Sequence, residues 1–306
     1  MICNVLIVGA GAMGCLFAAR FAAAGKVVTL VDVDRDRLAG IAGSGLVLRD
    51  DGGERRVSPR AALAADVTGP VDLVLLFTKG LHTRAAVESI AHLVSDDPLL
   101  LTLQNGVGNG EIIVETFGPG RVLVGTAHVP AELEPPNVVV THGFAHLHIG
   151  GLSPSGDRFA ADVAEVLREA GFDTGVSANI HADIWEKLAF NAALNPLAMV
   201  AGATNAMMNN DYGRLIARRI IAETVAVASA KGLVIDEAEV ANTVDRALAE
   251  HGHHKASMLQ DREAGRRTEI EFINGAVIRE GDRLNVDTSA NQMLTWLVRM
   301  IEERTA

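Results

Sequence analysis

The segment NVLIVGAGAMG, residues 4–14, joins a short aliphatic run to three closely spaced glycines. The aliphatic run predicts a buried strand, and the glycines predict a tight turn into the helical pattern that follows, CLFAARFAAAGK. A second aliphatic run, VVTLVD, ends at Asp32, 18 positions after Gly14. This order of strand, glycine turn, helix, strand and acidic residue is typical of a dinucleotide site. The alternative is a strand–helix turn that binds no ligand.

Each glycine of this loop has a physical reason to be there. Gly9 permits the tight turn, Gly11 lets the backbone approach a pyrophosphate, and Gly14 allows the helix to pack closely on the strand. The first helical turn offers unpaired N–H groups and the positive end of the helix dipole to the phosphates. The expected cofactor-binding residues of the loop are Gly9, Ala10, Gly11, Ala12, Met13 and Gly14.

Outward from this segment, the first half of the chain alternates aliphatic runs with helical patterns. The later runs are DLVLLFTKG (72–80), PLLLTLQNG (98–106) and RVLVGTAHV (121–129). Such runs predict parallel strands that are buried on both faces, and the alternation predicts a doubly wound α/β sheet. Around residues 138 to 150, NVVVTHGFAHLHIGG is expected to form a hairpin with Gly143 at its turn.

Strand signals end at about residue 179. The remaining segments carry helical periodicity, among them ADIWEKLAFNAALNPLAMVAG, GRLIARRIIAETVAVASAKG, EAEVANTVDRALAEHG and DREAGRRTEIEFINGAVIREGDRL. The predicted fold class is therefore α/β, with a dinucleotide-binding domain over residues 1–178. An all-helical domain that binds substrate and carries catalysis is expected over residues 179–306.

Composition limits the kind of protein. The 306 residues are 49% hydrophobic and 21% charged, which excludes a disordered chain, and the net charge of −11 argues against a nucleic-acid partner. The apolar first 25 residues lack the basic flank of a signal peptide, and no apolar stretch is long enough to cross a bilayer. Cys3 and Cys15 both lie in segments that we expect to be buried, so we expect no disulfide framework and a soluble protein of the cytoplasm.

Three polar residues in the apolar segment EKLAFNAALNP (186–196) suggest a site. Lys187, Asn191 and Asn195 are spaced by four, so they share one face of a helix. One interpretation is a hydrogen-bond network between helices. The other is a cleft wall that meets a cofactor and a polar substrate, where a desolvated lysine can serve as a proton donor.

Four motifs together resemble the ketopantoate reductases (2-dehydropantoate 2-reductases). They are the glycine loop, LQNG at 103–106, WEKLAFNAALNP at 185–196, and SMLQDREAGRRTEIEFINGAV at 257–277. The resemblance covers essentially the whole chain in the right order. It implies a Rossmann-type domain, a helical domain and an active site in the cleft between them. It further implies reduction of a 2-oxo acid to a 2-hydroxy acid, most specifically ketopantoate to pantoate in pantothenate biosynthesis.

The resemblance also assigns roles to residues. It places the catalytic lysine at Lys187 and the essential acidic residue at Glu269. Lys187 would stabilise the developing oxyanion and deliver the proton, and Glu269 would bind a substrate hydroxyl and pair with Lys187. The implied substrate-binding residues are Asn105, Asn191, Asn195, Asn205 and Ser257, and both Lys79 and Asn105 are implied to contact the cofactor.

One position departs from the family pattern. Relatives that prefer NADPH carry an arginine just after the second strand, where this chain has Val33 beside Asp32. The carboxylate of Asp32 would bind the ribose hydroxyls and repel a 2′-phosphate, which favours NADH. Lys79 and Arg35 favour NADPH, so the cofactor is expected to be either NADH or NADPH.

Several alternatives stay open at this point. The substrate could be another branched 2-oxo acid, and the chain could be a sensor or scaffold that binds the cofactor without catalysis. A homodimer is an open assembly, and no membrane partner is expected. HGHH at 251–254 is interpreted as a loop between helices rather than a metal site, and His142, His146 and His148 as residues on the face of a sheet.

Overall fold

The computed structural model describes residues 1–143 and 145–304. The chain forms two compact units: unit 1 comprises Met1–Gln104 and Asn109–Ile180, and unit 2 comprises Asn105–Gly108 and the residues from His181 onward. The short segment 105–108 groups with the helices of unit 2, an assignment that the predicted division between residues 178 and 179 did not include.

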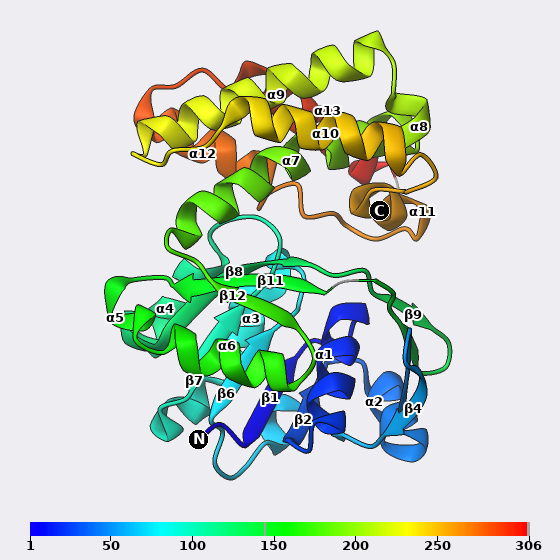
Figure 1. Ribbon diagram of the computed structural model, residues 1–306, viewed down its shortest axis with the longest axis vertical. Coiled ribbons are helices and arrows are strands. Elements are labelled where there is room, and N and C mark those ends of the chain that lie inside the picture. The colour runs from blue at the N-terminus through cyan, green and yellow to red at the C-terminus, as the bar shows by residue number, and fades with distance from the viewer. Residues whose placement is uncertain (144, 305–306) are drawn as a thin grey trace. The chain divides into compact units, whose positions relative to one another are not determined.

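Unit 1 is built on an eight-stranded sheet (Figure 1). All neighbouring strands are parallel except β11, which runs antiparallel to β8. In spatial order the strands are β12 (Asp173–Val176), β11 (His146–Gly151), β8 (Val122–His128), β7 (Leu99–Thr102), β6 (Leu73–Leu76), β1 (Asn4–Val8), β2 (Val27–Val31) and β5 (Arg60–Ala62).

Helices cover both faces of this sheet, which explains the continuous aliphatic runs of its strands. Successive residues of a strand point to opposite faces. In β1, Val5 and Ile7 join one core, whereas Leu6 and Val8 join the other. The first core is completed by helices α1 (Ala12–Ala23) and α6 (Ala160–Glu169), and the second by α3 (Thr83–Ser89), η3 (Ala91–Asp96) and α4 (Asn109–Phe117). The predicted α/β class with a parallel-rich sheet is confirmed.

A second, four-stranded sheet corrects one prediction. Its order is β4 (Gly53–Val57), β3 (Leu46–Asp50), β10 (Val138–Val140) and β9 (Glu132–Glu134). The strands β10 and β11 were expected to form a hairpin, but β10 pairs with β3 and β9, whereas β11 pairs with β8 and β12. The expectation was wrong because two adjacent alternating runs do not reveal which sheet each run joins. Phe144, near the expected turn, lies outside the described residues.

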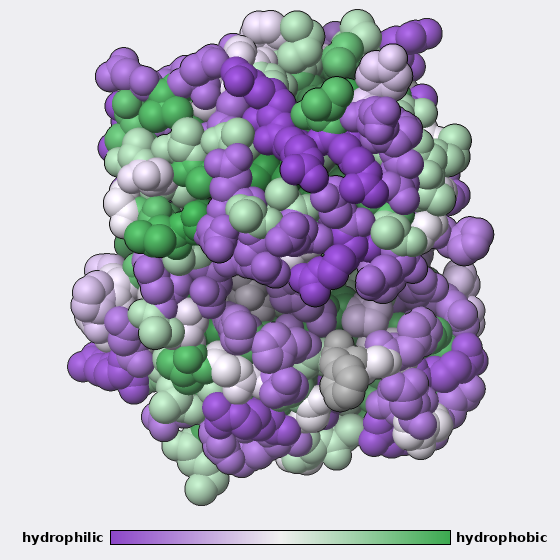
Figure 2. Space-filling model, turned by 45° about the horizontal axis from the view of Figure 1, so that its top comes forward, coloured by the Kyte–Doolittle hydropathy of each residue, from purple (hydrophilic) through white to green (hydrophobic). Residues whose placement is uncertain are grey.

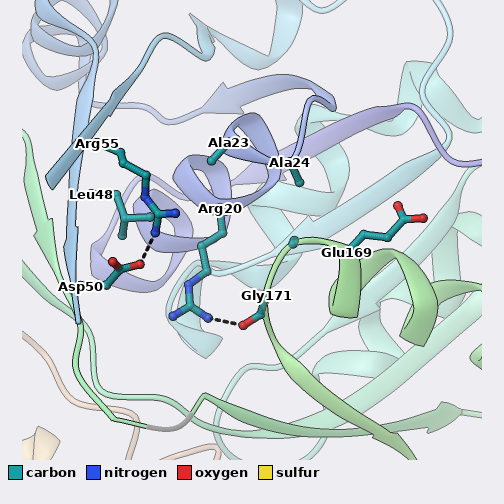
Figure 3. A pocket seen from close by; sticks show the side chains of 9 residues that line it. Arg20, Ala23, Ala24, Leu48, Asp50, Arg55, Glu169 and Gly171 are labelled. Carbon is teal, nitrogen blue, oxygen red and sulfur yellow. Dashed lines mark hydrogen bonds and ion pairs between the residues drawn. The ribbon is translucent and has the colours of Figure 1, made fainter. Parts of the chain in front are cut away.

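The C-terminal end of α1 is tied to the loop after α6 by Arg20 (Figure 3). The Arg20 guanidinium donates to the Gly171 carbonyl over 2.8 Å and lies 4.7 Å from the centre of the Phe172 ring. Burial lowers the pKa of Arg20 below its ordinary value. The adjoining pocket of about 230 Å³ is also lined by Asp50 and Arg55, which pair with each other. Arg20 therefore stabilises the packing of α1 at the end opposite the glycine loop.

The remaining elements of unit 1 connect these strands. They are α2 (Arg35–Ser44), α5 (Pro154–Asp157), η1 (Ala64–Asp66), η2 (Gly80–His82) and η4 (Pro119–Arg121).

The regular secondary structure of unit 2 is helical among its described residues, as predicted. Its helices are α7 (Ile180–Ala201), α8 (Asn205–Met208), α9 (Asp211–Ala230), α10 (Glu237–Glu250), α11 (Ser257–Glu263), α12 (Asn274–Leu284) and α13 (Ser289–Glu303). The middle of α7 is buried on all sides within the core of this unit. The segment 264–273 was expected to be helical, but it forms turns between α11 and α12. HGHH forms a loop after α10, as predicted.

The surface shown in Figure 2 is mainly hydrophilic, with hydrophobic residues in small groups. No helix of the described chain is long and apolar enough to span a membrane. Cys15 is buried, but Cys3, which we expected to be buried, is exposed; both thiols are free. Cys3 lies one residue before β1.

Candidate active site

The glycine loop has the geometry that its sequence predicts. Gly9 has a φ of +106°, and a Cβ there would lie 2.9 Å from the backbone of Phe77. A Cβ at Gly14 would lie 1.8 Å from the carbonyl oxygen of Gly9. Neither position can carry a side chain without movement of the backbone, because these contacts are shorter than van der Waals contact allows. The loop is therefore held tightly against the sheet.

Gly11 differs from the other two glycines because open space adjoins it. A Cβ at Gly11 would meet no atom within 4 Å. Gly11 is also the N-cap residue of α1, and no side chain caps this helix. An uncapped helix N-terminus facing open space fits a bound pyrophosphate, because its N–H groups and dipole attract negative charge.

Asp32 lies directly after β2 and contacts this loop. Its carboxylate accepts from the backbone N–H of Ala10 over 2.6 Å and from that of Asp34 over 3.0 Å. Arg37 of α2 donates to the Ala10 carbonyl over 2.8 Å. Arg37 was not among the predicted residues; the only signal was its place on the helix after Asp32. Val33 and Arg35 are exposed.

A network of side chains joins the loops that follow β6 and β7. The amide of Gln104 donates to the Thr78 carbonyl over 2.6 Å and to the Thr83 hydroxyl over 2.8 Å, and it accepts from Thr102 over 2.8 Å. The network fixes the backbone directly before Lys79, which itself makes further contacts. Gln104 was not among the predicted residues, because Thr78 and Thr83, two of its three partners, lie more than 20 residues away in sequence.

In unit 2, Lys187 lies on α7, where it is partly buried. Burial lowers the pKa of Lys187 from 10.5 to about 8, and the Glu269 carboxylate opposes this by raising it. The two residues named as catalytic therefore lie within electrostatic reach of each other. A lysine with a pKa near 8 is still mostly protonated at pH 7, so it can act as a proton donor.

Asn191 and Asn195 have an unusual combination of properties. They are only 8% and 7% exposed, yet neither side-chain amide forms a hydrogen bond to another described residue. Among the described residues, the fully buried side-chain polar atoms without a partner are Asn274 Oδ1 and Thr288 Oγ1, so the polar atoms of Asn191 and Asn195 keep some access to solvent, from which a ligand can reach them. Since both residues follow Lys187 at spacings of four and eight, α7 offers one ammonium and two available amides to a polar ligand.

Glu269 is held in place by contacts on either side of it. Thr268 donates from its N–H and its hydroxyl to Glu302 of α13, each over 2.7 Å. The Glu269 carbonyl accepts from the N–H groups of Phe272 and Ile273, which closes a turn. The side chain of Glu269 thus projects from an anchored turn and not from a helix.

Asn105 belongs to the loop that packs on this turn. Val107 donates to the Phe272 carbonyl over 3.0 Å. Gly106 has a φ of +86°, and a Cβ there would lie 2.1 Å from the same carbonyl oxygen. The LQNG motif requires its glycine for this close approach, which places the Asn105 backbone beside the Glu269 turn.

Two other predicted residues are placed less directly. Asn205, on α8, is buried and donates through its amide nitrogen to the Ala247 carbonyl of α10 over 3.0 Å. This contact gives Asn205 a structural task that the sequence did not indicate. Ser257 is exposed at the first position of α11.

Comparisons with known proteins cover nearly all of the chain. The family description "Ketopantoate reductase PanE/ApbA" matches residues 5–154, and "Ketopantoate reductase PanE/ApbA C terminal" matches residues 179–302. A 2-dehydropantoate 2-reductase of Pyrococcus horikoshii is 33% identical over 301 residues, covering 98% of this chain and 97% of the relative. One from Streptococcus pyogenes serotype M1 is 30% identical over 300 residues, covering 97% of each chain.

Two solved structures resemble the fold over 99% of both chains. D-mandelate dehydrogenase with NADH and anilino(oxo)acetate has a TM-score of 0.94 at 29% identity. A PanE/ApbA family ketopantoate reductase from Ralstonia eutropha JMP134 has a TM-score of 0.90 at 30% identity.

Proposed function

Because this chain belongs to the ketopantoate reductase family, and is thus an NAD(P)-dependent oxidoreductase that reduces a 2-oxo acid, we propose ketopantoate as its substrate and pantoate as its product. One observation carries the proposal. Lys187, with its pKa lowered to about 8, is followed along α7 by two buried amides that have no partner among the described residues. A ligand with a carboxylate and a hydroxyl beside a reactive carbonyl matches those three groups.

The residues of the cofactor site fit a dinucleotide. The open space at Gly11 and the uncapped N-terminus of α1 would hold its pyrophosphate, and Asp32 the ribose hydroxyls. When bound, the reduced nicotinamide supplies the hydride that reduces C2 of the substrate. The glycine loop cannot shift easily at Gly9 and Gly14, because Gly9 is in close contact with the backbone of Phe77 and Gly14 with that of Gly9.

Lys187 has two tasks in the proposed reaction. Negative charge develops on the substrate's carbonyl oxygen as C2 is reduced, and the Lys187 ammonium stabilises it by a charge-assisted hydrogen bond. The same group then gives its proton to that oxygen, so that the C=O becomes a C–OH and Lys187 is left as a neutral amine. Solvent returns the proton before the next turnover. The lowered pKa makes this transfer easier than from an ordinary lysine.

The other polar residues would bind and orient the substrate. The amides of Asn191 and Asn195 can donate to a carboxylate or accept from a hydroxyl, since each amide carries both kinds of group. Glu269 can accept from a substrate hydroxyl while its charge keeps Lys187 protonated. Ser257 and Asn105 are proposed as further contacts on the family resemblance.

For the cofactor, we favour NADH over NADPH. The Asp32 carboxylate is tied to Ala10 of the glycine loop, and it would repel a 2′-phosphate bound beside it, because like charges repel. D-mandelate dehydrogenase, which has a very similar fold, was solved with NADH.

The same structure supports a second candidate. Anilino(oxo)acetate, bound in that dehydrogenase, carries an aromatic ring beside a 2-oxo acid. An aryl 2-oxo acid is therefore the second candidate substrate. The purified protein should be assayed with ketopantoate, benzoylformate and branched 2-oxo acids, each with NADH and with NADPH. A kcat/KM for ketopantoate below that for every other acid would refute the assignment, and no turnover with any acid would favour a non-catalytic binding protein.

For location, we propose the cytoplasm. The two thiols are free and one of them is exposed, and a reducing compartment preserves such thiols.

A further inference from the structure

Helix α7 contains a proline where its backbone ladder should be continuous. Pro196 lies inside the helix, which continues to Ala201. Proline has no N–H and its ring crowds the carbonyl four residues earlier, so Ala192 loses its partner within the helix. Ala192 is fully buried, and water cannot replace that partner. An unpaired carbonyl here would cost about 1–3 kcal/mol.

Asn274, the first residue of α12, supplies the missing donor. Its side-chain nitrogen lies 3.1 Å from the Ala192 carbonyl oxygen. Asn274 is itself fully buried, so this contact is shielded from solvent. A side chain from another helix thus takes the place of the N–H that Pro196 lacks.

The orientation of Asn274 is determined by a second contact. The same nitrogen donates to the side-chain oxygen of Asn291 over 3.0 Å. The side-chain oxygen of Asn274 has no partner among the described residues. If the amide were reversed, that oxygen would face two other oxygens, so the unpaired oxygen is the less costly arrangement.

Asn291 is in turn held by a buried carboxylate. Glu223 of α9 accepts from the Asn291 amide over 2.9 Å and from the backbone N–H groups of Ala290 and Asn291. Arg219 pairs with Glu223 over 3.1 Å. The Ala192 carbonyl of α7 is therefore held by a chain of contacts. Asn274 of α12 contacts this carbonyl, Asn291 of α13 contacts Asn274, and Glu223 of α9 contacts Asn291.

That carbonyl belongs to the part of α7 that carries the candidate catalytic groups. Lys187 and Asn191 precede the interrupted turn 192–196, and Asn195 lies within it. The path of the backbone through this turn sets where Asn195 stands relative to the other two side chains. Their spacing must be right for one small substrate to meet all three.

We propose that Asn274 is a positioning residue for the reduction, holding α7 at Pro196 so that Lys187, Asn191 and Asn195 converge on one substrate. This inference rests on the proposed function. Asn274 does not touch the reacting atoms; it acts through the Ala192 carbonyl. A misplacement of about 1 Å in an active site can lower the rate by on the order of 10²-fold.

The test is a cycle of four proteins: wild type, Asn274→Ala, Pro196→Ala and the double variant. Pro196→Ala restores the N–H that pairs with Ala192 inside the helix. The double variant should therefore regain much of the stability that Asn274→Ala loses, measured by urea unfolding. Its kcat/KM should remain roughly 10- to 100-fold below wild type, because α7 no longer has the tether to Asn274 that positions its polar side chains. Full recovery of both quantities would reduce Asn274 to a purely structural residue and overturn the proposal.

Thr224→Ala is the matched control. Thr224 is also fully buried in unit 2, but its hydroxyl bonds to the Ile220 carbonyl of its own helix over 2.8 Å. Loss of stability with unchanged kcat/KM is expected for this variant. If it lowers kcat/KM as much as Asn274→Ala does, general loosening explains the effect and the proposal fails.

A second readout does not depend on turnover. The ¹³Cε resonance of Lys187 in lysine-labelled protein, assigned by its absence in Lys187→Arg, reports its titration. Loosening of α7 should admit water and raise the pKa of Lys187 by roughly one unit in Asn274→Ala and leave it unchanged in Thr224→Ala. If wild type reduces no 2-oxo acid, the proposed function fails, and this titration alone then decides whether Asn274 positions Lys187. An unchanged titration in Asn274→Ala would overturn the inference.

Discussion

The carboxylate of Asp32 accepts a hydrogen bond from the backbone N–H of Ala10, with 2.6 Å between the two heavy atoms. This contact ties the end of β2 to the glycine loop. Asp32 therefore has a structural task besides its charge, and a test of cofactor preference has to separate the two.

Asp32→Asn should raise the use of NADPH relative to NADH. The amide keeps an oxygen that can accept from Ala10 but removes the negative charge that repels a 2′-phosphate. Repulsion between like charges about 4 Å apart is on the order of 1 kcal/mol in water, so the ratio of the two kcat/KM values should shift about fivefold. Asp36→Asn, which removes an exposed charge from the first turn of α2, is the control. A wild type that prefers NADPH a hundredfold would contradict the interpretation of Asp32.

The proton-donor role of Lys187 predicts a pH limit on turnover. Lys187 is protonated below its pKa of about 8, so kcat should fall as the pH rises through that value. Lys187→Ala should lower kcat by about 10²–10⁴-fold with little change in cofactor affinity. Near-normal turnover in this variant would restore the interpretation of α7 as a structural network.

Lys187 should also lower the stability of the fold. Its folded pKa of about 8 lies below the ordinary 10.5, so burial disfavours the charged form. Each unit is about 1.4 kcal/mol, which makes the penalty on the order of 3 kcal/mol. Lys187→Met should raise the free energy of unfolding at pH 7. The penalty is fully present below pH 8 and disappears by about pH 10.5, so the gain should vanish over that range. A variant that is less stable than wild type at pH 7 would refute this.

Removing the charge of Glu269 should move the alkaline limit of activity. Glu269 raises the pKa of Lys187, so Glu269→Gln should lower that pKa further and shift the fall in kcat to lower pH. Substrate use should also weaken strongly, with little change in melting temperature. Glu271→Gln is a suitable control, because Glu271 pairs with Arg299 over 2.7 and 2.8 Å. An unchanged pH profile in Glu269→Gln would show that Glu269 does not influence the protonation of Lys187.

The sequence was informative where a strong physical constraint acts on consecutive residues. The strands LVLL and LLLT are buried on both faces, so their aliphatic runs indicate a parallel sheet without ambiguity. Gly9 and Gly14 could be assigned because the backbone contacts leave no room for a side chain. The stripe of Lys187, Asn191 and Asn195 stood out because polar residues are rare in a helix buried on all sides.

Other features could not be predicted because their cause lies in distant parts of the chain. The strand GERRV is mostly exposed, so it has no hydrophobic pattern to reveal it. The segment around Glu269 has helical periodicity, but the anchor at Thr268 and the contact of Phe272 with Val107 keep it in turns. The contact of Asn205 with the carbonyl of Ala247 depends on packing between α8 and α10.

The placement of residues 105–108 in unit 2 bears on the order in which this protein is made. Gly106 leaves the ribosome 166 residues before Phe272, the residue on which it packs. At typical rates of synthesis, that interval is roughly 10 to 30 s. During that interval the loop 105–108 has been synthesised, but the Phe272 segment on which it packs has not. A C-terminal fragment that begins at residue 181 would be made without this loop and would lack the backbone that covers the Phe272 carbonyl.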